Sequence, residues 1–221
     1  MKKLESSLKN MLLVLTLVTA VSVALLAYVN ALTQKPIADA QANILQTAIG
    51  LVVPEFDNNP AAEVDEVEVG GQAIRIYAAM KDGKYVGSAV EAKAPGYGGD
   101  LQVLVGFDAD GNIYGYSILS HSETPGLGSK VATWFQKGEK GDVVGKNPGT
   151  AELKVSKDGG EVDAITASTI TSRAFLQAVK TAYAVYKGNT KEAEAISGAT
   201  QQVESQDVEA TEAEASSNNK E

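Results

Sequence analysis

The sequence predicts an α+β domain with a largely antiparallel sheet and packed helices, behind a single N-terminal transmembrane helix. Three features carry this prediction: a long uncharged apolar run near the N-terminus, a series of short alternating segments joined by Asp-Gly turns, and an amphipathic segment that follows them. Because strands come first and helices afterwards, the α+β class is favoured over an alternating α/β fold.

The N-terminal part reads as a membrane anchor. Residues 1–10 form a basic stub with three lysines and one acid, and residues 11–32 contain no charged side chain. Such a run can cross a hydrocarbon core of about 30 Å. The positive-inside rule then places the stub in the cytoplasm and the rest of the chain outside. The alternative is a cleaved signal peptide, but this run exceeds the usual ~7–15 apolar residues. We therefore favour a retained anchor.

A stalk and the first strands follow the anchor. Residues 33–62 are interpreted as a stalk or linker, in which the spacing of apolar residues predicts a helix over 36–49. The domain is expected over 63–187. It begins at 63–69, where acids alternate with valine and predict an edge strand.

Two hairpins are expected next. Segments 73–80 and 85–92 flank the sequence KDGK, whose Asp-Gly pair is a strong hairpin signal. Segments 101–107 and 113–119 flank DADGN in the same way. The sequence APGYGG between the hairpins, residues 94–99, is interpreted as a glycine-rich loop, and residues 152–156 as a further strand.

An amphipathic helix ends the domain. Thr171 or Ser172 is expected to cap it, since hydroxyl side chains favour that position. Its buried face has the three- and four-residue spacing of a helix and consists of Phe175, Ala178, Val179, Ala182, Val185 and Tyr186. From Gly188 to residue 221 the chain is acidic and poor in large apolar residues, and disorder is expected.

Composition excludes several kinds of site. The chain has no cysteine and one histidine, so disulfides, thiolate metal sites and multi-histidine metal sites are excluded. The net charge is −9, which argues against nucleic-acid binding. The sequence also shows no nucleophile–base pairing of a free-standing enzyme. No catalytic residue and no metal ligand is therefore predicted.

A hydroxyl-rich cluster precedes the last helix, in the sequence DAITASTITSRAF from Asp163 to Phe175. Thr169 would lie just before a helix N-terminus, where free N–H groups favour a phosphate. Arg173 in the first turn is expected to add a charge-assisted contact. The plainer interpretation is a hydroxyl-rich helix cap. A second segment, HSETPGLGSKVATWF from His121 to Phe135, contains a Pro-Gly turn suited to close approach of a flat ring. Ser129 is expected to cap a short helix there, and His121 to have a structural or solvated role.

Together these two segments resemble the covalent FMN-binding domains found in the G subunit of Rnf-type ion-translocating electron transport complexes. The C subunit of the sodium-translocating NADH:quinone reductase is a close relative. In that family a flavin transferase reads an Asp, two free positions, a Ser or Thr, two small residues, and then the acceptor hydroxyl. Those positions are Asp163, Thr166, Ala167, Ser168 and Thr169 here, although the family usually has Gly-Ala before the acceptor.

The resemblance implies FMN joined to Thr169 by a phosphoester. It also implies a flavin-binding set made of Asp163, Thr166, Ser168, Thr171, Glu123, Thr124, Gly126, Leu127 and Gly128. The sequence SGAT, which ends at Thr200, is an alternative attachment site, but Thr169 is preferred because it has the Asp and the following helix.

The implied function is electron relay between ferredoxin and NAD, as a redox subunit of an ion-translocating oxidoreductase, or translocase, of the cell inner membrane. The subunit would be single-pass, with its main domain periplasmic. Its expected partners are the other membrane subunits of the complex, a flavin transferase and membrane lipid. Two alternatives stay open: the quinone-reductase subunit, and a non-redox anchored module for binding or assembly.

Overall fold

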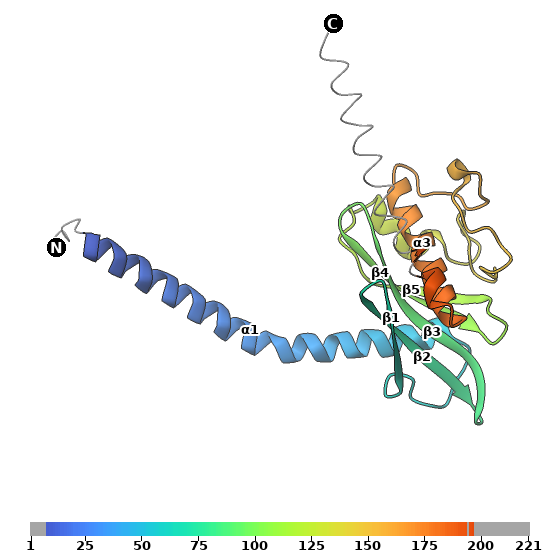
Figure 1. The fold of residues 1–221 in the computed structure, drawn as a ribbon, viewed down its shortest axis with the longest axis horizontal. Helices are drawn as coiled ribbons and strands as arrows, with labels where there is room; N and C mark the ends of the chain where they lie inside the picture. The colour runs from blue at the N-terminus through green and yellow to red at the C-terminus, as the bar shows by residue number, and fades with distance from the viewer. Residues whose placement is uncertain (1–7, 194, 197–221) are drawn as a thin grey trace, which may run out of the picture. The chain divides into compact units, whose positions relative to one another are not determined.

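The computed structural model describes residues 8–193 and 195–196 (Figure 1). The chain divides into two units, the first ending at Ile44 and the second beginning at Leu45. The first unit consists of most of helix α1, and the second contains the sheet and the remaining helices.

Helix α1 runs from Leu8 to Val52 and is long and apolar enough to cross a membrane. Its hydroxyls are satisfied within the helix: those of Thr16, Thr19 and Ser22 donate to carbonyls four residues earlier, at 2.8 Å in each case. The sequence predicted an anchor and a separate stalk helix, but the structure joins them. Pro36 lies inside α1, where it removes one backbone hydrogen bond without ending the helix.

The sheet is a five-stranded antiparallel meander in the order β1-β2-β3-β4-β5. The five strands expected between residues 63 and 119 all form, and the expected fold class is confirmed. The strands are β1 Val64–Val69, β2 Gln72–Lys81, β3 Lys84–Pro95, β4 Asp100–Asp108 and β5 Ile113–Ser120.

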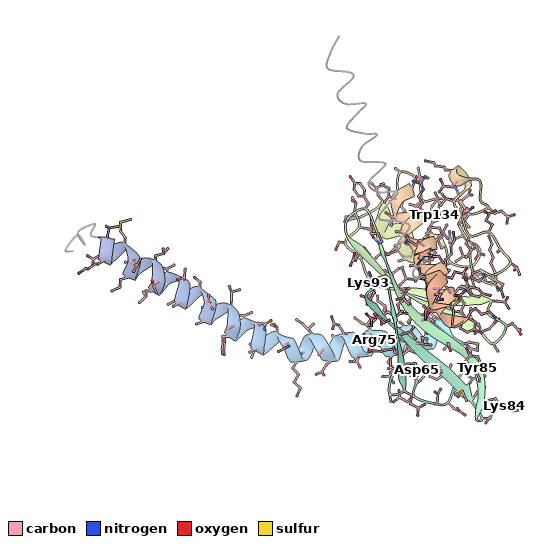
Figure 2. The ribbon with its side chains drawn as sticks, viewed as in Figure 1. Asp65, Arg75, Lys84, Tyr85, Lys93 and Trp134 are labelled. Carbon is pink, nitrogen blue, oxygen red and sulfur yellow. The ribbon has the colours of Figure 1, made fainter. Side chains whose placement is uncertain are left out.

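Both predicted hairpin turns are present. At the first, Asp82 and Gly83 have φ values of 51° and 71°, as a type I′ turn requires. Figure 2 shows Lys84 and Tyr85 at the tip of this hairpin. At the second, the Asp108 carboxylate accepts backbone hydrogen bonds from Asp110 and Asn112, both at 2.9 Å.

Helix α3, Thr169–Tyr186, covers one face of the sheet (Figure 1). Phe175 lies at the centre of this core, where it stacks on Phe135 at a centroid distance of 4.3 Å and meets Tyr116 edge-on at 4.7 Å. The face that the sequence predicted for this helix is buried, apart from the half-buried Tyr186.

The last turns of α1 cover a second apolar cluster. Ala48, Ile49 and Val52 are buried with strand residues that include Leu104. These turns approach the sheet closely above Gly106, where a Cβ atom would overlap the carbonyl oxygen of Val52. Residues 45–62, which the sequence assigned to a stalk, therefore lie in the compact unit that contains the sheet.

The segment between β5 and α3 has little regular structure, with η1 Gly128–Lys130, α2 Val131–Trp134 and η2 Ser156–Asp158. The Tyr116 hydroxyl holds the start of this segment in place by donating to the Val131 carbonyl at 2.8 Å. Burial raises the pKa of this phenol. The prediction of a strand over residues 152–156 is wrong. Val155 makes only an isolated bridge to Val162, because the chain turns into η2 at the next residue.

Disorder was expected from Gly188 onward, but residues 190–193 and 195–196 are helical. Ala193 is fully buried against the core, and Ile196 packs beside it. Asn189 begins this turn, since its side-chain oxygen accepts the Glu192 N–H at 3.3 Å. Thr200, the alternative attachment site, lies outside the described residues.

Candidate functional site

The predicted site centres on the start of α3. The helix begins at Thr169 with Ser168 as N-cap residue, and Ser168 makes no side-chain capping bond. The expectation that Thr171 or Ser172 caps the helix is therefore wrong. Both side chains are fully buried and bond elsewhere: the Ser172 hydroxyl accepts the Ile165 N–H and donates to the Ser168 carbonyl, each at 2.9 Å. Thr169 is consequently the first helical residue and not the residue before the helix.

The hydroxyl groups of this cluster differ in whether they donate a hydrogen bond and in the group that accepts it. Thr171 Oγ1 donates to Glu123 Oε2 at 2.8 Å. Since its only proton is used there, Ser168 Oγ must be the donor in the 3.0 Å bond between Ser168 and Thr171. Thr169 Oγ1 accepts from Lys157 Nζ at 3.2 Å and, within the described residues, donates no hydrogen bond. Half-buried Thr169 thus has an undonated proton at the start of the helix.

The residue two positions before Thr169 is strained. Ala167 has a φ of 60°, in the left-handed region that non-glycine residues rarely adopt. It follows directly on Thr166, which is exposed, and Asp163 is exposed as well. Asp163, Thr166 and Ala167 are therefore accessible to another protein, and the strained turn at Ala167 brings the chain into α3.

Glu123 connects three segments that are distant in sequence. Its side chain is buried, and besides Thr171 it accepts the backbone N–H groups of Tyr97 at 2.8 Å and Gly98 at 3.4 Å. The glycine-rich sequence 94–99, interpreted as a plain loop, is thereby joined to the ETPGLG loop and to α3. Sequence reasoning missed this connection, since nothing in either segment indicates its partner.

Two glycines allow the carboxylate to lie there. A Cβ atom at Gly96 would overlap Glu123 Oε1, and one at Gly128 would overlap Glu123 Oε2 and lie 2.9 Å from Thr171 Oγ1. The glycines at these two positions are thus explained by packing around Glu123. Glycine is suited to position 126 for a different reason. Open space surrounds it, but its φ of 77° lies in the left-handed region, which other residues rarely adopt.

The rest of the ETPGLG loop is exposed. The Thr124 carbonyl accepts the N–H groups of Leu127 at 3.2 Å and Ser129 at 3.3 Å. Ser129 does not cap a helix as expected; it lies inside η1, and its hydroxyl accepts the Gly126 N–H at 2.9 Å. The single histidine has a structural contact, since His121 Nδ1 accepts the Glu123 N–H at 3.2 Å.

Each of the three segments that meet at Glu123 also carries an exposed apolar side chain. These are Tyr97 in the glycine-rich loop, Leu127 in the ETPGLG loop and Ile170 in the first turn of α3. Exposed apolar groups beside a half-buried hydroxyl suit a ligand that has a flat ring and a phosphate.

Figure 2 shows Trp134 near the beginning of α3, where its indole N–H donates to the Asp163 carbonyl at 2.8 Å.

The basic group at Thr169 is not the expected one. Arg173 is bidentate to the Asp158 carboxylate at 2.9 and 2.7 Å, and this hydrogen-bonded pair lowers the pKa of Asp158. Lys157, the neighbour of Asp158 in η2, reaches Thr169 instead. A shallow pocket of about 480 Å³ lies between β5 and α2, and shares none of the residues named in this cluster.

Comparison with known proteins covers the same segments. Residues 96–184, from the glycine-rich loop into the last turn of α3, match the FMN-binding domain family. The chain is 38% identical over 198 residues to the G subunit of the ion-translocating oxidoreductase complex of Aliivibrio fischeri, and the match covers 85% of this chain and 94% of that protein. It is 39% identical over 179 residues to the protein of the same name from Escherichia coli, covering 76% and 85%.

Among solved structures, the fold is similar to the crystal structure of Shewanella oneidensis NqrC, with a TM-score of 0.41 and 22% identity over 65% of this chain and 70% of that chain. The identity and coverage of the sequence relatives decide the assignment. The chain belongs to the family of ion-translocating oxidoreductase complex G subunits and contains the FMN-binding domain of that family.

Proposed function

We propose that this protein is an electron-transfer subunit of a membrane-bound ion-translocating oxidoreductase and carries FMN covalently, as a phosphoester on Thr169. The observation that carries the attachment site is the undonated Thr169 hydroxyl, half-buried beside Lys157 at the first residue of α3. Buried Thr171 and Ser172 are unsuitable acceptors, because their hydroxyl protons are already bonded inside the domain.

Ester formation conserves the oxidation states of all groups. Thr169 Oγ1 forms a bond to the flavin-side phosphorus of a phosphoanhydride that the flavin transferase binds. The P–O bond from this phosphorus to the bridging oxygen breaks, the second phosphate leaves as a phosphomonoester with that oxygen, and the hydroxyl proton is released. FMN accepts one or two electrons and so supplies the redox chemistry. The chain's own residues hold the phosphate end at Thr169 and offer the exposed apolar side chains of Tyr97, Leu127 and Ile170 to the ring.

The anchor fixes where this chemistry takes place. We place the N-terminus in the cytoplasm and the domain on the periplasmic side of the inner membrane, since the basic residues precede the span. The span from Met11 to Leu32 has no charged side chain, so ion translocation belongs to other subunits of the complex. Electrons would pass between those subunits through the flavin, on the path between ferredoxin and NAD.

The test is to map the flavin after co-expression with a flavin transferase. Trypsin cleaves after Lys157 and Arg173, so Thr169 is released on peptide 158–173, whereas Thr200 lies on peptide 192–220. We expect the mass of FMN less one water on the first peptide, with fragmentation placing it on Thr169. Thr169→Val should abolish in-gel flavin fluorescence while the domain still folds.

The matched control is Thr150→Val, which removes an exposed hydroxyl outside the attachment motif and should retain the flavin. Flavin on peptide 192–220 would keep the redox function and move the site to Thr200. Absence of flavin from every peptide of the wild-type protein would contradict the proposal and favour an anchored binding module.

A further inference from the structure

The turn that carries Lys157 is firmly attached to the domain. It comprises η2 Ser156–Asp158 and lies between Val155 and Val162, which are both buried and form a bridge with each other. The Ser156 N–H also donates to the Val162 carbonyl at 2.8 Å. The exposed residues of the turn are therefore presented on a short, closed loop anchored at both ends.

Two adjacent residues of this turn contact the same face of α3. Lys157 Nζ donates to Thr169 Oγ1 at 3.2 Å, and the Asp158 carboxylate accepts two bonds from Arg173. Thr169 and Arg173 are four residues apart and so lie one above the other on the helix. The bidentate pair fixes the position of the turn along α3, and Lys157 is thereby directed to the first residue of the helix.

The hydrogen bond from Lys157 to Thr169 contributes little to stability before the flavin is attached, because the exposed ammonium group loses hydrating water when it binds a neutral hydroxyl. A phosphodiester on the same oxygen changes this, since it places a negative charge within reach of Nζ and makes the hydrogen bond charge-assisted. Arg173 is already bound to Asp158, and Lys154 in the preceding segment is paired with Glu152. Lys157 is thus the cation directed at the acceptor oxygen.

We infer that Lys157 is a flavin-phosphate-binding residue, which pairs with the phosphodiester on Thr169, and that the Asp158–Arg173 pair is the device that positions it. This inference rests on the proposed attachment of FMN at Thr169. It replaces Arg173, the cation expected from sequence, with a residue that lies outside the recognised attachment motif.

The experiment uses the full chain in detergent micelles with a purified flavin transferase, and follows covalent flavin by in-gel fluorescence over time. Three variants are compared with the wild type. Lys157→Met removes the charge and keeps the aliphatic length, Lys157→Arg keeps the charge, and Lys154→Met removes a nearby exposed lysine as the control. We expect Lys157→Met to slow attachment about tenfold, as the loss of a partly screened charge-assisted bond implies. Lys157→Arg should recover most of the rate, and Lys154→Met should match the wild type.

A second readout concerns the finished product and does not depend on the transferase. In the ³¹P NMR spectrum of the flavinylated protein, the phosphodiester resonance should move in Lys157→Met and stay in place in Lys154→Met. Before flavin is attached, Lys157→Met and wild type should unfold at the same urea concentration, which a merely structural lysine would not allow.

Attachment to Lys157→Met at the wild-type rate together with an unmoved ³¹P resonance would overturn the inference. So would a loss of stability in unflavinylated Lys157→Met, or a Lys157→Arg variant as slow as Lys157→Met. Wild-type protein without flavin on Thr169 is a distinct result, which would remove the proposed attachment site and the inference together.

Discussion

Replacing Glu123 should destabilise the domain, although the loop that carries it is largely exposed. The carboxylate accepts two bonds of 2.8 Å, from Tyr97 N and Thr171 Oγ1. Glu123→Ala removes both acceptors. The Tyr97 N–H lies in an exposed loop and can return to water, but the fully buried Thr171 hydroxyl cannot.

The expected loss follows from these two bonds. A hydrogen bond to a charged group contributes about 1.5–3 kcal/mol, and an unsatisfied buried donor costs about 1–3 kcal/mol. Because Tyr97 can be rehydrated, we expect Glu123→Ala to lower the free energy of unfolding by about 3 kcal/mol. Thr171→Val keeps the shape of the side chain but removes its bond to Glu123 and the acceptor of the Ser168 hydroxyl. Because the half-buried Ser168 hydroxyl can bond to water instead, the variant should lower the free energy of unfolding by about 1.5 kcal/mol.

The measurement is urea unfolding of the unflavinylated full chain in detergent, followed by tryptophan fluorescence. Trp134 is the only tryptophan of the chain, and its indole N–H is bonded to the Asp163 carbonyl, so the signal reports the domain and not the anchor. Glu161→Ala, which removes an exposed carboxylate, is the control and should leave the midpoint unchanged.

The double variant of Glu123 and Thr171 gives the decisive comparison. Both single changes remove the same bond, so the loss in the double variant should fall short of the sum by about 1.5 kcal/mol. Strict additivity, or a Glu123→Ala midpoint equal to that of the wild type, would refute the argument that this carboxylate holds the three segments together.

Three further changes test other parts of the structure by the same unfolding assay. Ala167→Gly should raise the free energy of unfolding by about 1 kcal/mol, because it relieves a left-handed alanine; an unchanged or lower value would contradict the strain. Gly106→Ala should lower the free energy of unfolding by about 2 kcal/mol or more, because the new Cβ atom would force the end of α1 off the sheet. Gly115 is its partner on the adjacent strand β5, where the atoms nearest to an added Cβ are 3.4 Å away. Gly115→Ala should therefore cost less than about 1 kcal/mol. Asp158→Asn should cost less than about 1 kcal/mol at pH 7, since its pair with Arg173 is half exposed. Because that pair lowers the Asp158 pKa, its contribution is complete above the unfolded-state pKa of about 3.9 and is lost as the pH falls through the folded-state value. A difference between wild type and Asp158→Asn that persists at low pH would count against it.

The strands were predictable from sequence because their signals are local. Alternation marks each strand, and the Asp-Gly pair at Asp82 and Gly83 matches the turn geometry that the hairpin needs. The buried face of α3 follows from helical spacing in the same way. In contrast, apolar spacing at Leu45, Ala48 and Val52 does not say what the helix packs on, so this segment was assigned to a stalk.

The site was only partly predictable, because its main contacts are long-range. Glu123 and Thr171 are 48 residues apart, and the loop at Tyr97 is 26 residues from Glu123. A single sequence shows which residues carry hydroxyls and carboxylates but not which of them meet. The same limit explains why Arg173 was chosen as the cation, since its partner Asp158 and the approach of Lys157 depend on the fold.

The hydroxyl groups at the start of α3 differ in their hydrogen bonds, and this difference bears on the order of events during maturation. In the unfolded chain the hydroxyls from Thr166 to Ser172 are chemically alike. They become different only when the glycine-rich loop, the ETPGLG loop and α3 have come together around Glu123 and have buried Thr171 and Ser172. Contacts between such distant segments form slowly, because the entropy of closing the intervening chain must first be overcome. A modifying enzyme that distinguishes Thr169 from Thr171 and Ser172 by their burial therefore selects for folded protein, and a covalently attached cofactor would then show that the domain had folded before the cofactor was attached.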